Sequence, residues 1–344
     1  MENIYLDRNE NNYGPATACI DIVRNASADL FYQYSTDYKK GMKSILSGRL
    51  SNEFNIPEKR VLLGYGAEDL LKQVVQCHLH NNKKLMIPSH SWWYYKEIAN
   101  EVNGINVEYP LIEGEDSYYY DIEKLLELYE TENPDIVFIS SPNNPTGNSI
   151  SNEDLNKVLD RLKDTVVVLD EAYWMSNNNE QAANLVNTYP NLIIIRTFSK
   201  LYALAGIRIG YALVGENLSL LAKMSNRYLG YNRISQKIAI AALDSPEYYE
   251  DIAAKMKSDR ELYFNELNQL PEFKVYKSDA NFVLVKIPKE IMTPMNNFLK
   301  ERGVIIKFMN EEVLNSHLRI SLGTQEQNKK AIELIKQFVE QNNN

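Results

Sequence analysis

The chain has 344 residues, of which 44% are hydrophobic and 24% are charged, as is ordinary for a globular protein of roughly two domains. Its formal net charge of -9 gives it no electrostatic reason to bind nucleic acid or an anionic membrane surface. No segment approaches the ~18 consecutive apolar residues of a membrane span, and the N-terminus lacks a signal-peptide pattern. The two cysteines, Cys19 and Cys77, make no disulfide framework, which predicts a cytoplasmic protein.

The middle of the chain alternates apolar and amphipathic segments. Three short runs rich in β-branched residues stand at Ile136–Ile139, Val166–Leu169 and Leu192–Ile195. Such runs are typical of strands that are buried on both faces of a parallel sheet. The helical pattern at 152–162 lies between the first two runs. This order predicts an α/β domain.

A different pattern begins after about residue 240. Helices are predicted at 248–270, 292–302 and 325–339, and strands at 273–276, 281–285, 304–307 and 318–321. These elements predict a compact α+β unit against which the N-terminal segment packs. We therefore expect a large α/β domain over residues 31–240 and a small domain made of residues 1–30 and 241–344.

Polar side chains follow each of the three apolar runs. Asn144 lies in the turn after the first run, Asp170 and Tyr173 follow the second, and Ser199 and Lys200 follow the third. Each has an ordinary structural explanation on its own, as a turn residue, a helix cap or a solvated side chain. Ligands of open α/β sheets bind beyond the carboxyl ends of the strands, so the set as a whole favours a binding site.

The set matches the needs of pyridoxal 5'-phosphate (PLP). This cofactor requires a lysine for its Schiff base, an acid beside its pyridine nitrogen, donors near its phenolic oxygen and an anion site for its phosphate. The sequence offers a candidate for each requirement. It therefore predicts PLP as the cofactor.

The same residues resemble the signature of fold-type I PLP-dependent aminotransferases of class I/II. The series Asn144-Pro145-Thr146-Gly147, Asp170-Glu171-Ala172-Tyr173 and Ser199-Lys200, with Arg208 downstream, is most similar to the histidinol-phosphate aminotransferase family. Residues 6–15, 66–68 and 318–324 resemble further segments of that family, so the resemblance covers nearly the whole chain. It implies an aspartate aminotransferase-like fold with a large, mostly parallel α/β domain and a smaller α+β domain.

The resemblance also implies roles for individual residues. Lys200 forms the Schiff base and later moves the substrate's proton, Asp170 pairs with the ring nitrogen, and Tyr173 acts with them in catalysis. Tyr34 reaches the cofactor phosphate from the other subunit, which implies a homodimer with shared active sites. The full set of implied cofactor-binding residues is Gly66, Ala67, Glu68, His90, Asn144, Asp170, Tyr173, Thr197, Ser199, Lys200, Arg208 and Tyr34.

Substrate recognition is where the sequence departs from the family. Arg319, Tyr13 and Asn144 are the implied substrate-binding residues, with Arg319 gripping an acidic group. Lys307 stands where the family usually has an arginine, and residues 227–232 replace a family segment that approaches the substrate. The residue stacked on the cofactor ring is His90 or Trp92, and His90 is favoured because Pro88 then aligns with the family's proline.

The predicted function is therefore a PLP-dependent aminotransferase that moves an amino group between an amino acid or related amine and a 2-oxo acid. A second anionic group on that amine is left open. The alternative on the same scaffold is a PLP-dependent decarboxylase of an amino-acid phosphate, which product analysis would separate. A non-catalytic PLP-binding protein would have an added DNA-binding segment or lack the lysine, and the chain shows neither. Cys77 and His80 have helical spacing but no second pair, so no metal site is predicted.

Overall fold

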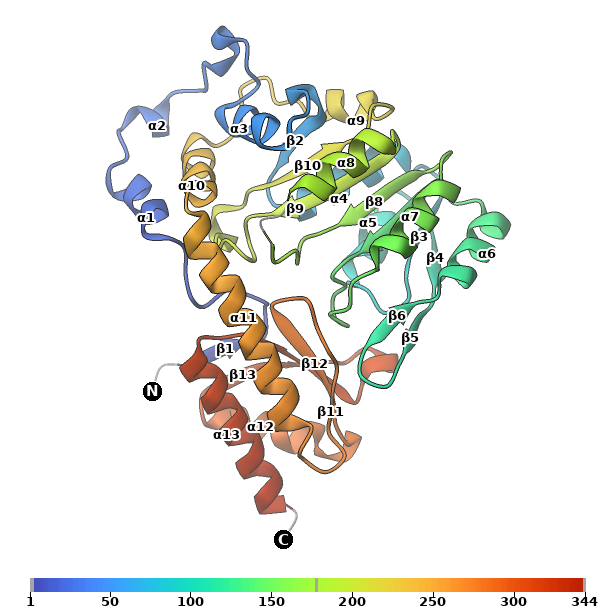
Figure 1. Cartoon of the computed structure of the whole chain (residues 1–344), viewed down its shortest axis with the longest axis vertical. Coiled ribbons are helices and arrows are strands. Elements are labelled where there is room, and N and C mark those ends of the chain that lie inside the picture. Colours follow the sequence, from blue (N-terminus) through green and yellow to red (C-terminus); the bar gives the residue numbers. More distant parts are fainter. Residues whose placement is uncertain (1–2, 177–178, 343–344) are drawn as a thin grey trace.

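The computed structural model describes residues 3–176 and 179–342. The molecule is elongated and has one large sheet in each half, with the long helix α11 (Pro246–Leu267) running between the halves (Figure 1). The larger sheet has seven strands and the smaller has five. None of the helices in these two described ranges combines the length and apolar character that crossing a bilayer requires.

The seven-stranded sheet contains the three strands that are predicted from the apolar runs in the middle of the chain. Ile136–Ser140 is β7, Val166–Asp170 is β8 and Leu192–Thr197 is β9, and they pair in parallel. β10 runs antiparallel to both of its neighbours, so the sheet is mostly parallel, as predicted. In spatial order the strands are β2 (Val61–Gly64), β10 (Gly210–Val214), β9, β8, β7, β3 (Lys84–Pro88) and β4 (Ile105–Tyr109).

Helices cover both faces of this sheet, which explains the uninterrupted apolar runs. In β9, Leu192 and Ile194 belong to the core on one face, whereas Ile193 and Ile195 belong to the core on the other. The first core includes α3 (Ile45–Phe54), α6 (Ile122–Glu132), α7 (Asn152–Arg161) and α8 (Glu180–Thr188). The second includes α4 (Ala67–His78), α5 (Tyr94–Asn100) and α9 (Ser219–Met224). The strand termini therefore remain as the edges where a ligand can enter.

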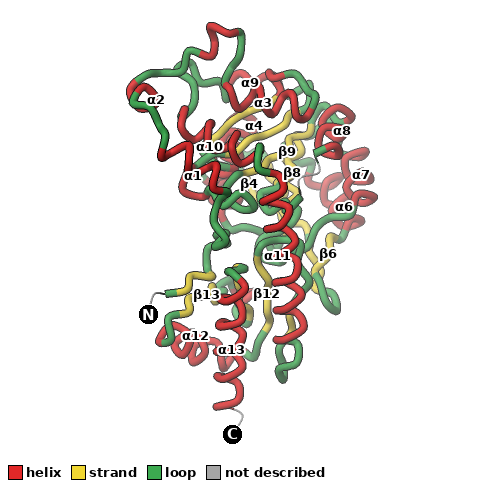
Figure 2. Tube along the Cα trace, turned by 60° about the vertical axis from the view of Figure 1, so that its left-hand side comes forward, coloured by secondary structure: helices red, strands yellow, loops and turns green. Residues whose placement is uncertain are grey.

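The five-stranded sheet forms the core of the other half. Its strand order is β1 (Ile4–Leu6), β13 (Val304–Phe308), β14 (His317–Ser321), β12 (Phe282–Lys286) and β11 (Lys274–Val275). The helices α11, α12 (Met292–Glu301) and α13 (Gln325–Asn342) pack beside it, and Figure 2 shows α11 and α13 running alongside one another. These elements confirm the predicted α+β unit. The short 3-10 helices are η1 (Asp37–Lys40), η2 (Glu58–Arg60), η3 (Ala205–Ile207), η4 (Lys289–Ile291) and η5 (Glu312–Leu314).

The N-terminal segment is divided between the two halves. β1 pairs in parallel with β13, which places it in the small sheet. By contrast, α1 (Thr17–Arg24) packs on α10 (Arg233–Leu243), and α2 (Asp29–Tyr32) lies near the same helix in the upper half (Figure 1). The division of the chain at residues 31 and 240 stays a prediction.

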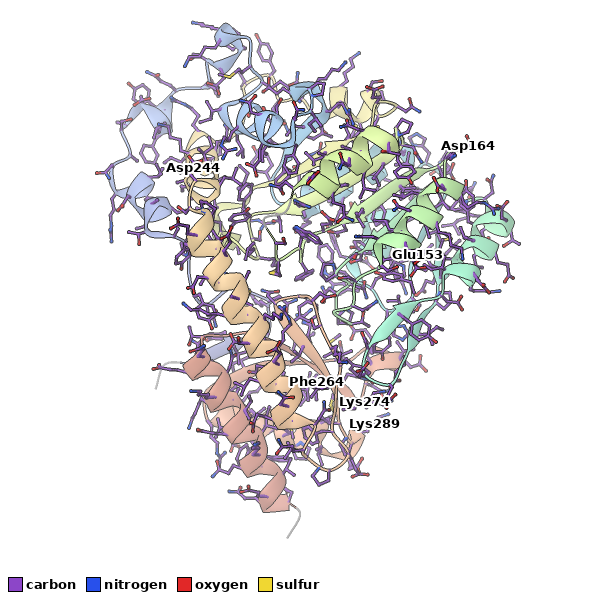
Figure 3. All side chains as sticks on the ribbon, viewed as in Figure 1. Glu153, Asp164, Asp244, Phe264, Lys274 and Lys289 are labelled. Carbon is purple, nitrogen blue, oxygen red and sulfur yellow. The ribbon has the colours of Figure 1, made fainter. Side chains whose placement is uncertain are left out.

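The hairpin formed by β5 (Leu111–Glu113) and β6 (Tyr118–Tyr120) joins the two halves. Glu113 accepts hydrogen bonds from the Tyr276 hydroxyl at 2.6 Å and from Lys274 Nζ at 2.9 Å. Figure 3 places Lys274 on the small-sheet side of this contact. Burial raises the pKa of Glu113, but these bonds and Lys286 outweigh it and hold the pKa at about 2. The small sheet is thereby fixed against the strand ends of the large one.

Candidate active site

A cavity of about 340 Å³ opens where the strands of the large sheet end. Asn144 follows β7, Asp170 ends β8 and Thr197 ends β9, as the sequence analysis predicts. Ala67 and Glu68 enter from the first turn of α4, and Arg319 enters from β14 of the small sheet. The other predicted site residues that line this cavity are Tyr173, Ser199, Lys200 and Arg208.

Asp170 is the buried acid of the cavity, with 4% of its surface exposed. Its Oδ1 accepts the Ala172 N–H at 2.9 Å, and its Oδ2 accepts the Tyr95 hydroxyl at 2.5 Å. Burial raises the pKa of Asp170, and the hydrogen bond from Tyr95 acts in the opposite direction. The carboxyl group is held in one orientation at the floor of the cavity.

Lys200 lies in the loop after β9, with its ammonium group at the cavity. Nζ donates to the backbone oxygens of Asn9, at 3.1 Å, and Arg8, at 3.4 Å. It also lies 5.3 Å from the centre of the Tyr173 ring. Asn9 connects these groups further, because its Nδ2 donates to the Tyr173 hydroxyl at 3.0 Å. The N-terminal segment therefore brings the lysine and the phenol together.

Arg319 extends across the cavity from the small sheet. Nη1 donates to Asn144 Oδ1 at 2.6 Å and Nη2 donates to the Asp7 carbonyl at 2.8 Å. Its Nε is buried and has no hydrogen-bond partner. Burial lowers the pKa of this guanidinium group, which nevertheless stays charged at neutral pH. A cation with an unused donor is suited to binding an anion.

Comparison with known proteins decides the family. The aminotransferase class I and II family matches residues 5–335, which is nearly the whole chain.

The chain belongs to the class I and II aminotransferase family.

It is a PLP-dependent aminotransferase similar to histidinol-phosphate aminotransferases. Histidinol-phosphate aminotransferase 2 of Archaeoglobus fulgidus is 32% identical over 98% of this chain and 93% of its own length. The crystal structure of histidinol-phosphate aminotransferase from Sinorhizobium meliloti, solved in complex with pyridoxal-5'-phosphate, superimposes with a TM-score of 0.85. Its sequence identity is 24%, and the match covers 98% of this chain and 92% of that one.

The fold alone does not separate aminotransferases from decarboxylases. The structure of L-threonine-O-3-phosphate decarboxylase from Porphyromonas gingivalis also matches, with a TM-score of 0.81 and 19% identity over 98% of this chain and 99% of that one. The family match is what assigns this chain to the aminotransferases.

The cavity of this aminotransferase contains a set of donors that fits a phosphate group. The first turn of α4 has no side-chain cap at Gly66, so its N–H groups are left for a ligand. The hydroxyls of Thr197 and Ser199 lie 3.0 Å apart, and Arg208 Nη1 is 3.5 Å from Ser199 Oγ. Gly66 has a φ of +83°, and a Cβ there would lie 2.8 Å from Arg208 Nη2. Only glycine leaves this guanidinium group in place.

His90, which the sequence favours as the stacking residue, does not lie at the cavity. Trp92 lines the cavity, whereas His90 lies outside its lining. The His90 ring instead packs on Tyr118 with centroids 5.6 Å apart, and its Nδ1 is 2.9 Å from Ser89 Oγ. Of the two candidates, Trp92 is therefore the one that lies at the cavity, and the identity of the stacking residue stays a prediction.

Two other predicted residues lie away from the cavity. The Tyr13 hydroxyl donates to Asp259 Oδ2 of α11 at 2.8 Å and the residue does not line the cavity, so Tyr13 is misplaced as a substrate contact in this structure. Tyr34 follows the end of α2, is 70% exposed and does not line the cavity of its own chain. That position is compatible with its predicted role, which is in the partner's site.

The sequence analysis missed Tyr95, Arg8 and Asn9, which all line the cavity. Asn9 lies in the segment 6–15, which resembles the family. Its contacts with Lys200 and Tyr173 depend on the path of the chain from β1 of the small sheet to the cavity. Tyr95 lies three residues after Trp92, and this spacing on a helix start was the available signal.

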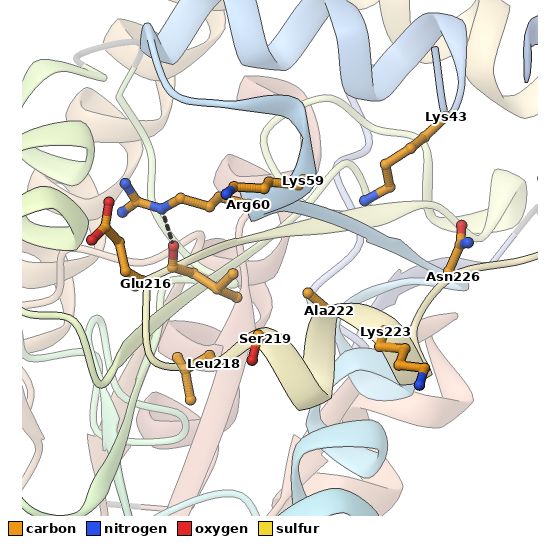
Figure 4. Close-up of a pocket in the computed structure, with 11 residues that line it drawn as sticks. Lys43, Lys59, Arg60, Glu216, Leu218, Ser219, Ala222, Lys223 and Asn226 are labelled. Carbon is orange, nitrogen blue, oxygen red and sulfur yellow. Dashed lines mark hydrogen bonds between the residues drawn. The ribbon is translucent and has the colours of Figure 1, made fainter. Parts of the chain in front are cut away.

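A larger cavity, of about 540 Å³, lies elsewhere and contains none of the predicted site residues (Figure 4). Two of the cations that line it donate hydrogen bonds to backbone carbonyl groups. Arg60 donates to the carbonyls of Val214, at 2.7 Å, and Val186, at 2.5 Å, and Lys43 Nζ donates to the Val61 carbonyl at 3.0 Å. In the two described ranges, no group of three His, Cys, Asp or Glu side chains is arranged to hold a metal ion.

Replacing Gly66 by alanine should weaken PLP binding by roughly tenfold or more, because the new methyl group displaces Arg208 and so removes a charge-assisted contact to the phosphate of ~1.5–3 kcal/mol. Titration of the apo-protein with PLP, followed by absorbance, measures the dissociation constant. Gly206→Ala is the matched control, since nothing lies within 4 Å of a Cβ there. Equal dissociation constants for the two variants would contradict the assignment of this turn to the phosphate.

Proposed function

We propose that the 340 Å³ cavity binds PLP, with Lys200 as the covalently attached residue and Asp170 beside the ring nitrogen. The observation that carries the proposal is the convergence of a lysine, a buried acid and an anion cradle in one cavity. These three groups come from separate elements of the large sheet.

The phosphate is held at the first turn of α4. The N–H groups of Ala67 and Glu68 lie at a helix start without a side-chain cap, where the partial positive charge of the helix favours an anion. Thr197 and Ser199 add hydroxyl donors, and Arg208 adds a full positive charge. Glu68 lies 3.8 Å from Arg208 and restrains the guanidinium group from the solvent side.

The ring is held by groups from three strands. Asn144 Oδ1 is already used by Arg319, so its Nδ2 is free to donate to the phenolic oxygen together with the Tyr173 hydroxyl. Asp170 keeps a proton on the ring nitrogen. Trp92 replaces His90 as the proposed stacking residue, since it is the aromatic side chain of that segment that lines the cavity.

Catalysis then depends on Lys200. When bound, PLP withdraws electrons from the α-carbon of an attached amine, and this is the chemistry of transamination. Lys200 Nζ is the base that would remove the proton from the substrate's α-carbon and pass it to the C4′ carbon of the cofactor. The ring of Tyr173 lies beside this amino group and would help to position it.

The experiment that tests this function uses Lys200→Ala and the visible spectrum of the PLP-loaded protein. The wild-type absorbance should change on addition of glutamate or histidinol phosphate and return on addition of a 2-oxo acid. Lys200→Ala should bind PLP without a covalent link and should not convert it to the aminated cofactor, so the cycle should not run. Lys223→Ala, in the cavity of Figure 4, is the control and should behave as wild type. A wild-type-like spectral cycle in Lys200→Ala would refute the assignment.

We further propose that the substrate is an amino acid or related amine with a second anionic group. A second cavity, of about 500 Å³, shares Trp92, Asn144 and Arg319 with the first. Lys307 lines it and is paired with Arg319 across β13 and β14, so the two cations face the same side of the sheet. Glu311 is the acid in this lining and favours substrates with a polar or basic part.

Lys307→Met should raise the KM for histidinol phosphate by about tenfold, as expected for the loss of one charge-assisted contact of ~1.5 kcal/mol. The KM for histidinol, which differs only in lacking the phosphate, should change little. Steady-state kinetics on the two amines makes the comparison. Lys289→Met, on η4, controls for loss of a lysine from the same sheet region. Equal changes for the two amines would contradict a role of Lys307 toward the anion.

We propose that the chain acts as a homodimer with shared active sites. Tyr32, Tyr34, Tyr38 and Tyr228 are all exposed and line one groove of about 890 Å³. An aromatic surface of this kind is typical of a protein–protein contact, and Tyr228 is 96% exposed. A second copy seated there would bring Tyr34 to the phosphate end of the partner's cavity. The cytoplasmic location is proposed on the two free, buried thiols Cys19 and Cys77.

Shared sites predict complementation between two inactive variants. Unfolding and refolding Lys200→Ala together with Tyr34→Ala should restore roughly a quarter of wild-type activity, because half of randomly mixed dimers carry one complete site of two. Lys200→Ala mixed with Asp170→Asn is the control and should stay inactive, since both changes fall in one chain's cavity. No recovery in the first mixture would contradict the shared site.

A further inference from the structure

The structure shows a buried hydroxyl group that the roles assigned above do not use. Tyr95, the second residue of α5, is 1% exposed, and its hydroxyl donates to Asp170 Oδ2 at 2.5 Å. Both residues line the cavity. The Ala172 N–H occupies the other carboxyl oxygen. Hydrogen bonds to ionised groups are short and roughly twice as strong as neutral ones, so this contact fixes the acid firmly.

The Tyr95 hydroxyl also affects whether Asp170 or the ring nitrogen of PLP carries the proton. Burial favours the neutral form of Asp170, which would leave the acid able to take a proton from a neighbouring ring nitrogen. A hydrogen bond to the carboxylate favours the charged form and opposes this tendency. Its removal would therefore make Asp170 a stronger competitor for the proton.

We propose that Tyr95 is a positioning residue, whose hydroxyl keeps Asp170 ionised and aimed into the cavity so that the proton stays on the ring nitrogen of bound PLP. The inference rests on the proposed role of Asp170. Tyr95 does not itself contact the reacting atoms. It acts through the carboxylate, and the electron-withdrawing strength of the cofactor depends on it.

The ring of Tyr95 has a separate, structural task. It packs edge-on against Trp92, with centroids 5.8 Å apart, and against Phe138, with centroids 5.1 Å apart. Phenylalanine at position 95 preserves these contacts and removes only the hydroxyl. Tyr109→Phe is a matched control, because Tyr109 is fully buried in the same domain and its hydroxyl donates to the Phe138 carbonyl at 2.9 Å.

The test is the ¹⁵N chemical shift of ring-labelled PLP bound to each variant. The wild type and Tyr109→Phe should show the shift of a protonated ring nitrogen near neutral pH. Tyr95→Phe should move the signal toward that of an unprotonated nitrogen at the same pH. Its kcat should fall by about tenfold, as expected for the loss of one hydrogen bond to a charged group, with KM nearly unchanged.

The variant Asp170→Asn distinguishes a failure of the proposed role of Asp170 from a failure of the proposed role of Tyr95. If this variant leaves the ¹⁵N signal of the wild type unchanged, the proposed role of Asp170 fails and the role of Tyr95 fails with it. If Asp170→Asn moves the signal and Tyr95→Phe does not, the inference about Tyr95 alone is overturned. Should Tyr95→Phe fold poorly, 3-fluorotyrosine at position 95 keeps the ring and is a stronger acid. It should keep the nitrogen protonated to higher pH than in the wild type, and an unchanged titration would overturn the inference.

Discussion

Asp170 is an acid buried at the end of a central strand, and the arrangement of the site follows from the cost of burying it. An ionised carboxylate away from water is expensive unless hydrogen bonds and positive charges compensate it. Here the Ala172 N–H and the Tyr95 hydroxyl occupy its two oxygens. The cavity contains the cations of Lys200, Arg208 and Arg319. The pyridinium ring of bound PLP would place a further positive charge next to the Asp170 carboxylate. The site for the cofactor is therefore already formed in the protein without it.

The two sheets contribute different parts of the function. The large sheet supplies the groups for the cofactor, since its parallel strands end at one edge. The small sheet contributes Arg319 and Lys307, which both line the cavity of about 500 Å³. Asn9 joins the two halves, because its backbone oxygen accepts from Lys200 and its backbone N–H donates to Ser321 Oγ of β14. Changes in the small sheet can therefore alter substrate choice while the cofactor groups stay intact.

Much of this architecture could be predicted from the sequence, because β7, β8 and β9 are buried on both faces and leave continuous apolar runs. The polar residues after each run then identify the cavity edge. The β5–β6 hairpin gave no such signal, since its strands are three residues long and are stabilised by Glu113 and its partners in the distant small sheet. Trp92 and Tyr95 could not be placed with certainty because a segment of four consecutive aromatics has no periodicity that sets its register. The contact of Tyr13 with Asp259 depends on the path of α11, which sequence patterns do not specify.

Reduction of the PLP-loaded protein with sodium borohydride, followed by mass spectrometry of its peptides, tests the central claim most directly. The reaction makes the link between the cofactor and its lysine permanent, so the modified residue is identified without any assumption about the substrate. The account predicts that the phosphopyridoxyl group is found on Lys200. Its presence on another lysine, or its absence from every lysine, would contradict the assignment of this cavity as the active site.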